Sequence, residues 1–139
     1  MSTEIIKQDG IILAIIAKID EIKDNLKFFS TEDFSLQVGI HNKEKGFCIG
    51  AHEHIPFPKL ENYQSQEAFY IKKGKVEVGI YHQNKKIISK ILSEGEFIIL
   101  NTGHDLKFLE DTQLFEIKQG PYRGKDGDKK DISPKNENF

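Results

Sequence analysis

Two histidines stand one residue apart in the stretch GAHEH, at positions 52 and 54. On an extended strand, side chains two residues apart share a face and lie about 6–7 Å apart along the chain. In that arrangement His52 and His54 can turn both imidazoles toward one metal ion, at about 2.0–2.1 Å if the ion is zinc. Cys48 would lie about 13 Å from His52 along the strand, which makes it a poor ligand for the same ion. The pair indicates either a metal site that needs further ligands or the polar end of an ordinary strand.

A glutamate that shares a face with apolar residues is the next candidate. Glu67 opens the stretch EAFYI, and the alternation of a strand puts it on one face with Phe69 and Ile71. A carboxylate among inward apolar side chains needs a cation or hydrogen bonds to offset the loss of water. A bound metal would supply this; the alternative is a residue at the start of a strand that stays in water.

A further histidine stands in the stretch GEFIILNTGHDLKF. On a strand His104 shares a face with Leu106 and Phe108, so its imidazole points where the apolar side chains point. His41 and His82 each border a turn rich in Asn and Lys, and we predict that both are surface residues. His104 is therefore the third candidate for the site of His52 and His54.

Glycines at fixed distances extend this pattern. Five residues separate Gly46 from the first histidine of the pair, and six separate Glu67 from Gly74. This spacing resembles the first motif of the cupin family, in which Gly, five residues, His-x-His, a short gap, Glu, six residues and Gly follow one another. The resemblance covers about residues 46–117. In cupins the ligands of one divalent metal come from this motif and from a histidine in a second motif, which implies His52, His54, Glu67 and His104 here.

Two features depart from the cupin pattern. Twelve residues, IPFPKLENYQSQ, separate His54 from Glu67, where cupins have a short gap. Residues added at the tip of a hairpin cost little free energy, so the pairing of the two ligand strands can survive the insert. In the second motif Asn101 replaces the usual proline, and a strict alignment puts Leu106 at the histidine position. A loop shorter by two residues keeps His104 as the ligand, and strand alternation favours this; otherwise three protein ligands remain.

Short apolar runs between turn residues are typical of an all-β protein. The run IILAIIA suits a strand buried on both faces, and the helical spacing of apolar residues in 18–30 allows one or two turns of helix. In 34–41 the alternation is regular, so the apolar side chains of that stretch should share one face. The expected strands are 11–17, 34–41, 47–54, 67–71, 76–81, 87–92, 97–100, 106–109 and 114–118.

This number of short strands favours a small β-barrel or sandwich. The resemblance implies a cupin-type double-stranded β-helix, or jelly-roll barrel, as a single domain over residues 1–120. Residues 121–139 are expected to form a polar tail that is partly disordered, especially in SPKNENF at its end. Because the edge strands of so small a barrel need cover, we expect a homodimer that pairs its N-terminal strands.

Composition excludes several classes of function. The chain has 139 residues, of which 37% are hydrophobic, as suits one domain with one core. A formal net charge of −2 leaves no basic field for nucleic acid and no polybasic membrane anchor. Cys48 is the only cysteine, the N-terminus carries acids where a secretion signal needs basic residues, and the run 11–17 is too short to cross a bilayer. These features predict a cytoplasmic protein.

Histidine and carboxylate ligands suit one divalent transition metal, and the sequence does not choose among Fe, Mn, Ni, Zn and Cu. The resemblance implies an enzyme that acts on a small polar metabolite such as a sugar or sugar nucleotide, as an isomerase, epimerase or oxygenase. Glu116 and Lys118 on the last strand, and Tyr63 and Gln64 in the insert, could contact such a ligand. Two alternatives stay open: a metal-free isomerase that uses histidines as acid and base, and a non-catalytic module that binds a metal or a ligand.

Overall fold

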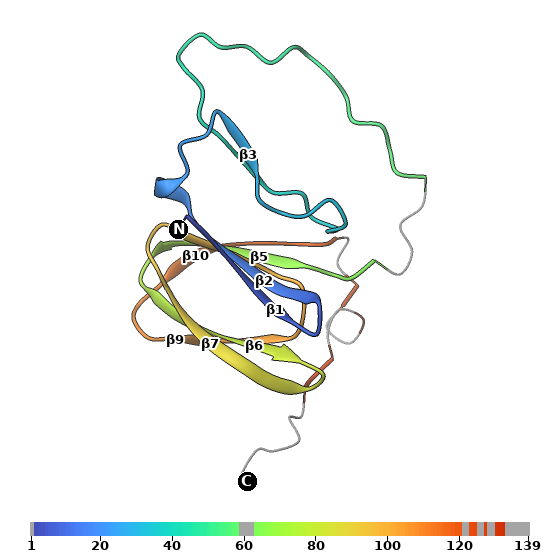
Figure 1. Cartoon of the computed structure of the whole chain (residues 1–139), viewed down its shortest axis with the longest axis vertical. Helices are drawn as coiled ribbons and strands as arrows, with labels where there is room; N and C mark the ends of the chain where they lie inside the picture. The colour runs from blue at the N-terminus through green and yellow to red at the C-terminus, as the bar shows by residue number, and fades with distance from the viewer. Residues whose placement is uncertain (1, 59–62, 121–122, 125–126, 128–129, 133–139) are drawn as a thin grey trace.

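The computed structural model describes residues 2–58, 63–120, 123–124, 127 and 130–132, and it is built from antiparallel β-strands (Figure 1). The strands are β1 (Thr3–Gln8), β2 (Ile11–Lys18), β3 (Leu26–Phe28), β4 (Gly39–His41), β5 (Glu67–Lys73), β6 (Lys75–His82), β7 (Lys85–Ser93), β8 (Glu96–Leu100), β9 (His104–Phe108) and β10 (Gln113–Lys118). A 3-10 turn, η1 (Ile19–Glu21), follows β2. No helix among these residues is long and apolar enough to span a membrane. The protein is therefore all-β, as its sequence predicts.

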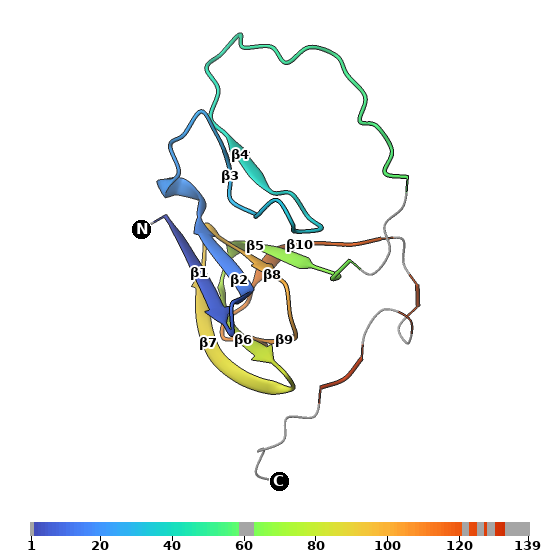
Figure 2. The same ribbon diagram turned by 45° about the vertical axis from the view of Figure 1, so that its right-hand side comes forward.

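Three sheets form the layers of the fold. The largest has the strand order β1-β2-β8-β5-β10, the second has the order β7-β6-β9, and β3 pairs with β4 in the third. Figures 1 and 2 show the five-stranded sheet in the middle, with the three-stranded sheet on one side and the β3–β4 layer on the other. Among the described strands, β9 and β10 each pair on one side only, and no ladder joins the two larger sheets.

The inner strands of the middle sheet, β2, β8 and β5, are largely buried on both faces because their side chains alternate between two hydrophobic cores. Phe69 and Ile71 of β5 pack into the core shared with the three-stranded sheet. Ala68 and Tyr70 of the same strand pack toward the β3–β4 layer. In β2, residues 13–17 are all buried, which confirms the prediction of a strand covered on both faces.

The prediction of a regular strand over 34–41 is correct for the face and wrong for the length. The side chains of Phe34, Leu36, Val38 and Ile40 pack together against the second core, but only Gly39–His41 form a strand. The Val38 N–H donates to the Ser30 hydroxyl at 2.8 Å instead of to a neighbouring strand, so a side chain interrupts the ladder here. In 18–30 the only helical element is η1.

The predicted strand over 47–54 is absent from the structure. These residues belong to the long connection between β4 and β5, and its described part arches away from the sheets (Figures 1 and 2). The side chains of Phe47 and Ile49 are 58% and 61% exposed. The alternation is present in the sequence, but no described strand pairs with the segment, and an extended chain without a partner does not form a sheet.

The strand β1 was not predicted from the sequence, because Ile6 is its only buried residue and the alternation is weak. The domain boundary predicted at residue 120 stays a prediction, although the last strand ends close by at Lys118. Of the predicted polar tail, the stretch SPKNENF at 133–139 lies outside the described residues.

Candidate functional site

Glu67 and His104, two of the four predicted metal ligands, lie in direct contact. The imidazole Nε2 of His104 lies 2.9 Å from the carboxylate Oε1 of Glu67. Both side chains are largely buried, with 26% of His104 and 19% of Glu67 exposed. The ring of Phe69 packs edge-on against the imidazole, with 6.2 Å between the ring centres. Both polar side chains therefore point inward, as strand alternation predicts.

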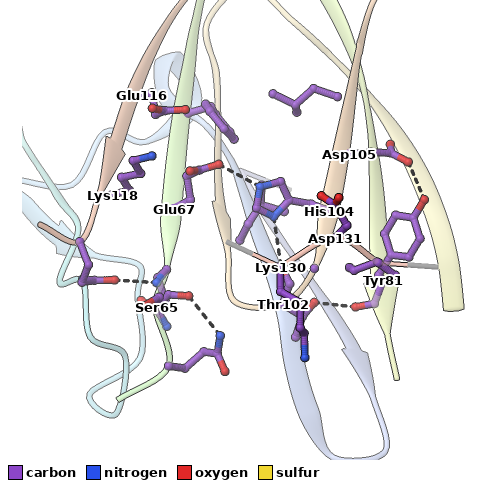
Figure 3. Close-up of a pocket in the computed structure, with 18 residues that line it drawn as sticks. Ser65, Glu67, Tyr81, Thr102, His104, Asp105, Glu116, Lys118, Lys130 and Asp131 are labelled. Carbon is purple, nitrogen blue, oxygen red and sulfur yellow. Dashed lines mark hydrogen bonds and ion pairs between the residues drawn. The ribbon is translucent and has the colours of Figure 1, made fainter. Parts of the chain in front are cut away.

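The corner between the two larger sheets brings this pair together. Glu67 is the first residue of β5 and pairs with Leu100, the last residue of β8. The chain then crosses over residues 101–103 and enters β9 at His104, which pairs with Ile80 of β6. Glu67 thus lies at the start of a strand in the five-stranded sheet, and His104 lies at the start of a strand in the neighbouring sheet (Figure 3).

The hydrogen-bond partner of Nδ1 indicates that this ring nitrogen of His104 carries a hydrogen. Nδ1 lies 3.1 Å from the main-chain oxygen of Thr102, which can only accept, so Nδ1 carries a hydrogen. A protonated imidazole then donates its Nε2–H to the Glu67 carboxylate, so one proton lies between the two groups. Burial disfavours the charged imidazolium, but the hydrogen bonds to Glu67 and to Thr102 outweigh it and raise the pKa of His104 above its ordinary value.

A cavity of about 790 Å³ opens beside this pair. Phe69, Leu100 and Leu106 line its apolar part. Glu116 and Lys118 of β10 also line it, and Lys118 pairs in register with Glu67 on the neighbouring strand. The cavity therefore offers carboxylate, ammonium and imidazole groups over an apolar floor, which suits a small molecule with polar groups around an apolar skeleton.

His52 and His54 lie elsewhere, on the exposed connection between β4 and β5. Their rings pack edge to face with 5.2 Å between the centres, and Nδ1 of His52 lies 2.8 Å from the main-chain oxygen of Gly50. Neither of the two lines the cavity. Within the part of the chain that the structure describes, no three His, Cys, Asp or Glu side chains come together as a metal site. The structure thus assembles Glu67 with His104 and leaves His52 and His54 apart from them.

A second polar cluster lies next to His104 along β9. The Asp105 carboxylate accepts hydrogen bonds from the Tyr81 hydroxyl at 2.6 Å and the Gly79 N–H at 3.0 Å, and Lys86 Nζ lies 3.1 Å away. Burial opposes ionisation of Asp105, but the hydrogen bonds from Tyr81 and Lys86 outweigh it and lower its pKa. A Cβ at Gly79 would collide with the carboxylate, so a larger residue here would displace the Asp105 side chain. The Asp105 carboxylate of β9 thus contacts donors on both β6 and β7, so this cluster ties the three strands of the sheet together.

Some residues at the site were not predictable from the sequence pattern. The Thr102 carbonyl orients His104, and main-chain atoms leave no signal in a pattern of side chains. Lys130, Asp131 and Ile132 line the cavity although they belong to the predicted tail. The single apolar residue of that group, Ile132, was the available signal that this part of the tail packs against the fold. Gln64 lines the cavity as expected for the insert, whereas Tyr63 does not.

Comparison with known proteins gives no match: no family model fits the sequence, and no curated protein and no solved structure is significantly similar to it.

Proposed function

We propose that this protein is a cupin-like metal-binding protein whose metal site is built on Glu67 and His104. The observation that carries the proposal is their contact beside a polar cavity. Two ligand atoms that each lie about 2.1 Å from one ion are about 3.0–3.4 Å apart. The Nε2–Oε1 distance of 2.9 Å is close to this range, so a divalent ion can replace the shared proton with little movement of either side chain.

The orientation of His104 supports the same proposal. Histidines that bind a metal through one ring nitrogen commonly donate the other N–H to a carbonyl or carboxylate, which fixes the ring. Nδ1–H of His104 donates to the Thr102 carbonyl, so Nε2 is the nitrogen directed at Glu67. An imidazole and a carboxylate together suit Fe, Mn, Ni, Zn or Cu.

His52 and His54 are the proposed third and fourth ligands. Their imidazoles already lie close to each other, with ring centres 5.2 Å apart. In the described fold the outer edge of β9, which begins at His104, is free of a strand partner. We propose that residues 47–54 fold against this edge when metal binds. The added strand would extend the three-stranded sheet toward the jelly-roll barrel that the cupin resemblance implies.

The proposed ligand is a small polar metabolite such as a sugar or sugar nucleotide. When bound, the metal would polarise a carbonyl or activate water or oxygen, as an isomerase, epimerase or oxygenase requires. Glu116 and Lys118 would hold the polar groups of the ligand, and Phe69 and Leu106 would contact its apolar faces. A binding module without catalysis uses the same contacts. We further propose a cytoplasmic homodimer, because β1 is an edge strand and its Ile5 is 52% exposed.

The shared proton favours a second candidate, acid–base catalysis without a metal. A histidine with a raised pKa beside a carboxylate can donate a proton to a bound metabolite and take it back. The Glu67–His104 pair has this arrangement at the cavity wall. The metal-free isomerase considered from the sequence would use this pair, with no part for His52 and His54.

The metal content of tag-free protein tests the first candidate. We expect about one zinc, manganese, iron, nickel or copper ion per chain, lost in Glu67→Gln and His104→Ala and weakened in His52→Ala and His54→Ala. His41→Ala is the matched control, because this exposed histidine lies outside the cavity and should leave the metal content unchanged.

A folded wild type that takes up none of these metals would overturn the metal proposal. If the protein then isomerises a sugar phosphate or sugar nucleotide without metal and loses this activity in Glu67→Gln, the second candidate is correct. Loss of metal in Glu67→Gln and His104→Ala alone, with full occupancy in both loop variants, would limit the site to two protein ligands.

A further inference from the structure

One amide side chain is buried directly beside the Glu67–His104 pair. Gln66 is 3% exposed, and it is the only polar residue fully buried among those that the structure describes. Three of its polar groups, the side-chain oxygen, the side-chain nitrogen and the main-chain N–H, each form a hydrogen bond within the protein. Its Oε1 accepts from the Leu36 N–H at 3.0 Å, its own main-chain N–H donates to Gln119 Oε1 at 2.6 Å, and its Nε2 donates to Asn101 Oδ1 at 2.8 Å.

Asn101 continues this chain of amides to the next strand of the sheet. Its Nδ2 donates to the Ile12 carbonyl at 2.9 Å, and its main-chain N–H donates to the Leu13 carbonyl at 2.9 Å. Asn101 is therefore attached to β2 by two hydrogen bonds and to Gln66 by a third. The cupin resemblance expects a proline at this position, and a proline could make none of the contacts of the Asn101 side chain or N–H.

The two amides stand opposite each other at the end of a ladder. In the antiparallel pairing of β5 with β8, Glu67 lies opposite Leu100, so the next opposed positions are 66 and 101. The backbone ladder ends at the Glu67–Leu100 pair, because the chain leaves β8 there and crosses to β9. The side-chain bond between Gln66 and Asn101 therefore extends the pairing by one step at the corner between the sheets.

Each amide side chain belongs to the residue just before one that contributes to the Glu67–His104 contact. Gln66 precedes Glu67, and Asn101 precedes Thr102, whose carbonyl accepts the Nδ1–H of His104. A change in the separation of 66 and 101 would thus move the carboxylate relative to the imidazole. From these contacts we infer that the Gln66–Asn101 bridge positions Glu67 against His104. Gln66 is a positioning residue of the proposed metal site. Only the expected effect of Gln66 on metal affinity rests on the proposed metal-binding function.

Two variants of Gln66 test this inference. Gln66→Leu removes the bridge and keeps the volume. Gln66→Asn keeps an amide but shortens the side chain by one bond of about 1.5 Å, so it cannot span the 2.8 Å contact without movement. Asn42→Ala is the matched control, because the Asn42 amide also donates to two main-chain carbonyls, those of Ile22 and Asp24, far from the cavity.

The first readout is the ¹H–¹⁵N spectrum of the His104 side chain in chelator-treated protein. We expect slowly exchanging Nδ1–H and Nε2–H signals in the wild type and in Asn42→Ala, and their loss or displacement in both Gln66 variants. The second readout is the dissociation constant for Zn²⁺ alone, measured by calorimetry, which should rise about 10–100-fold in the Gln66 variants. A purely structural role would lower the unfolding midpoint and leave both readouts unchanged.

The inference is overturned if the folded Gln66 variants keep the wild-type His104 signals. Gln66→Asn is the milder change, and its His104 spectrum tests the inference if Gln66→Leu does not fold. If the wild type binds no Zn²⁺, the metal proposal fails, but the His104 spectrum is recorded without metal and still decides whether the bridge positions the pair.

Discussion

Replacing Glu67 by glutamine keeps the size of the side chain and removes the charge beside His104. A hydrogen bond to a charged group contributes about 1.5–3 kcal/mol to stability, whereas a fully exposed ion pair contributes about 0.2–1 kcal/mol. The Glu67 and His104 side chains are 19% and 26% exposed, and their atoms are 2.9 Å apart. We therefore expect Glu67→Gln to lower the free energy of unfolding of metal-free protein by about 1.5–2.5 kcal/mol where the imidazolium is present.

This loss depends on pH in a definite direction. The pKa of His104 is raised in the folded protein above its ordinary value of 6.5, so the folded state binds the proton more tightly than the unfolded state does. The stability that comes from the pair is fully present below the unfolded pKa and disappears as the pH rises through the folded pKa. The effect of Glu67→Gln should accordingly be large at about pH 5.5 and small at about pH 9.

Urea unfolding of chelator-treated protein at the two pH values measures this difference. Glu110→Gln is the control, because Glu110 pairs with Lys75 at 3.7 Å on the surface and the pair is about half exposed. Its loss should stay below about 0.5 kcal/mol at either pH. If Glu67→Gln cost the same free energy at both pH values, the contact would not depend on the protonation of His104, and the reasoning would be refuted.

Three further outcomes follow from the structure. Phe69→Ala removes a ring that is 1% exposed and packs against His104, so the free energy of unfolding should fall by about 3–5 kcal/mol in urea titrations; a loss below about 1 kcal/mol would contradict the packing. Gly79→Ala forces the Asp105 carboxylate away, which should destabilise the fold by about 1–3 kcal/mol. It should also return the pKa of Tyr81, raised by its hydrogen bond to Asp105, toward 10.0 in an ultraviolet titration compared with wild type; an unchanged titration would show that the contact survives. Chymotrypsin should cut first between 47 and 57, where the chain is exposed and forms no strand, and Zn²⁺ should slow this cut in wild type but not in Glu67→Gln. Mass spectrometry of the first fragments checks this, and an early cut within a strand of the middle sheet would contradict it.

The strands and the inner half of the site were predictable from the sequence because alternation reports which face is buried. Glu67 shares parity with Phe69 and Ile71, and His104 shares parity with Leu106, so both polar groups had to point toward the apolar side. The structure has both in the cavity wall. The turns between them placed the strands from β5 to β10 to within about two residues at each end; β9, which was expected over 106–109, begins at His104.

Pairing was not predictable, because a sequence pattern shows a face and not a partner. Apolar and polar residues alternate in 47–54 as regularly as in 34–41, yet no described strand pairs with 47–54. The positions of His52 and His54 could therefore not be derived from the alternation alone. The amides of Gln66 and Asn101 were missed for a related reason. Their opposition depends on the register of β5 with β8, which involves residues far apart in the chain.

The connection between β4 and β5 is anchored where it leaves the fold and where it returns. The Asn42 N–H donates to the Asn25 carbonyl at 2.9 Å, and the Ser35 hydroxyl donates to the Gln64 carbonyl at 2.8 Å. Between such anchors even a doubling of loop length changes the closure free energy by only about 0.6 kcal/mol. Insertions and deletions can therefore accumulate over generations in the part of this segment that follows His54, while Glu67 and His104 stay in place. The same property makes that part a natural position for grafting foreign peptides, with recognition redesigned separately from the scaffold and from the proposed ligands.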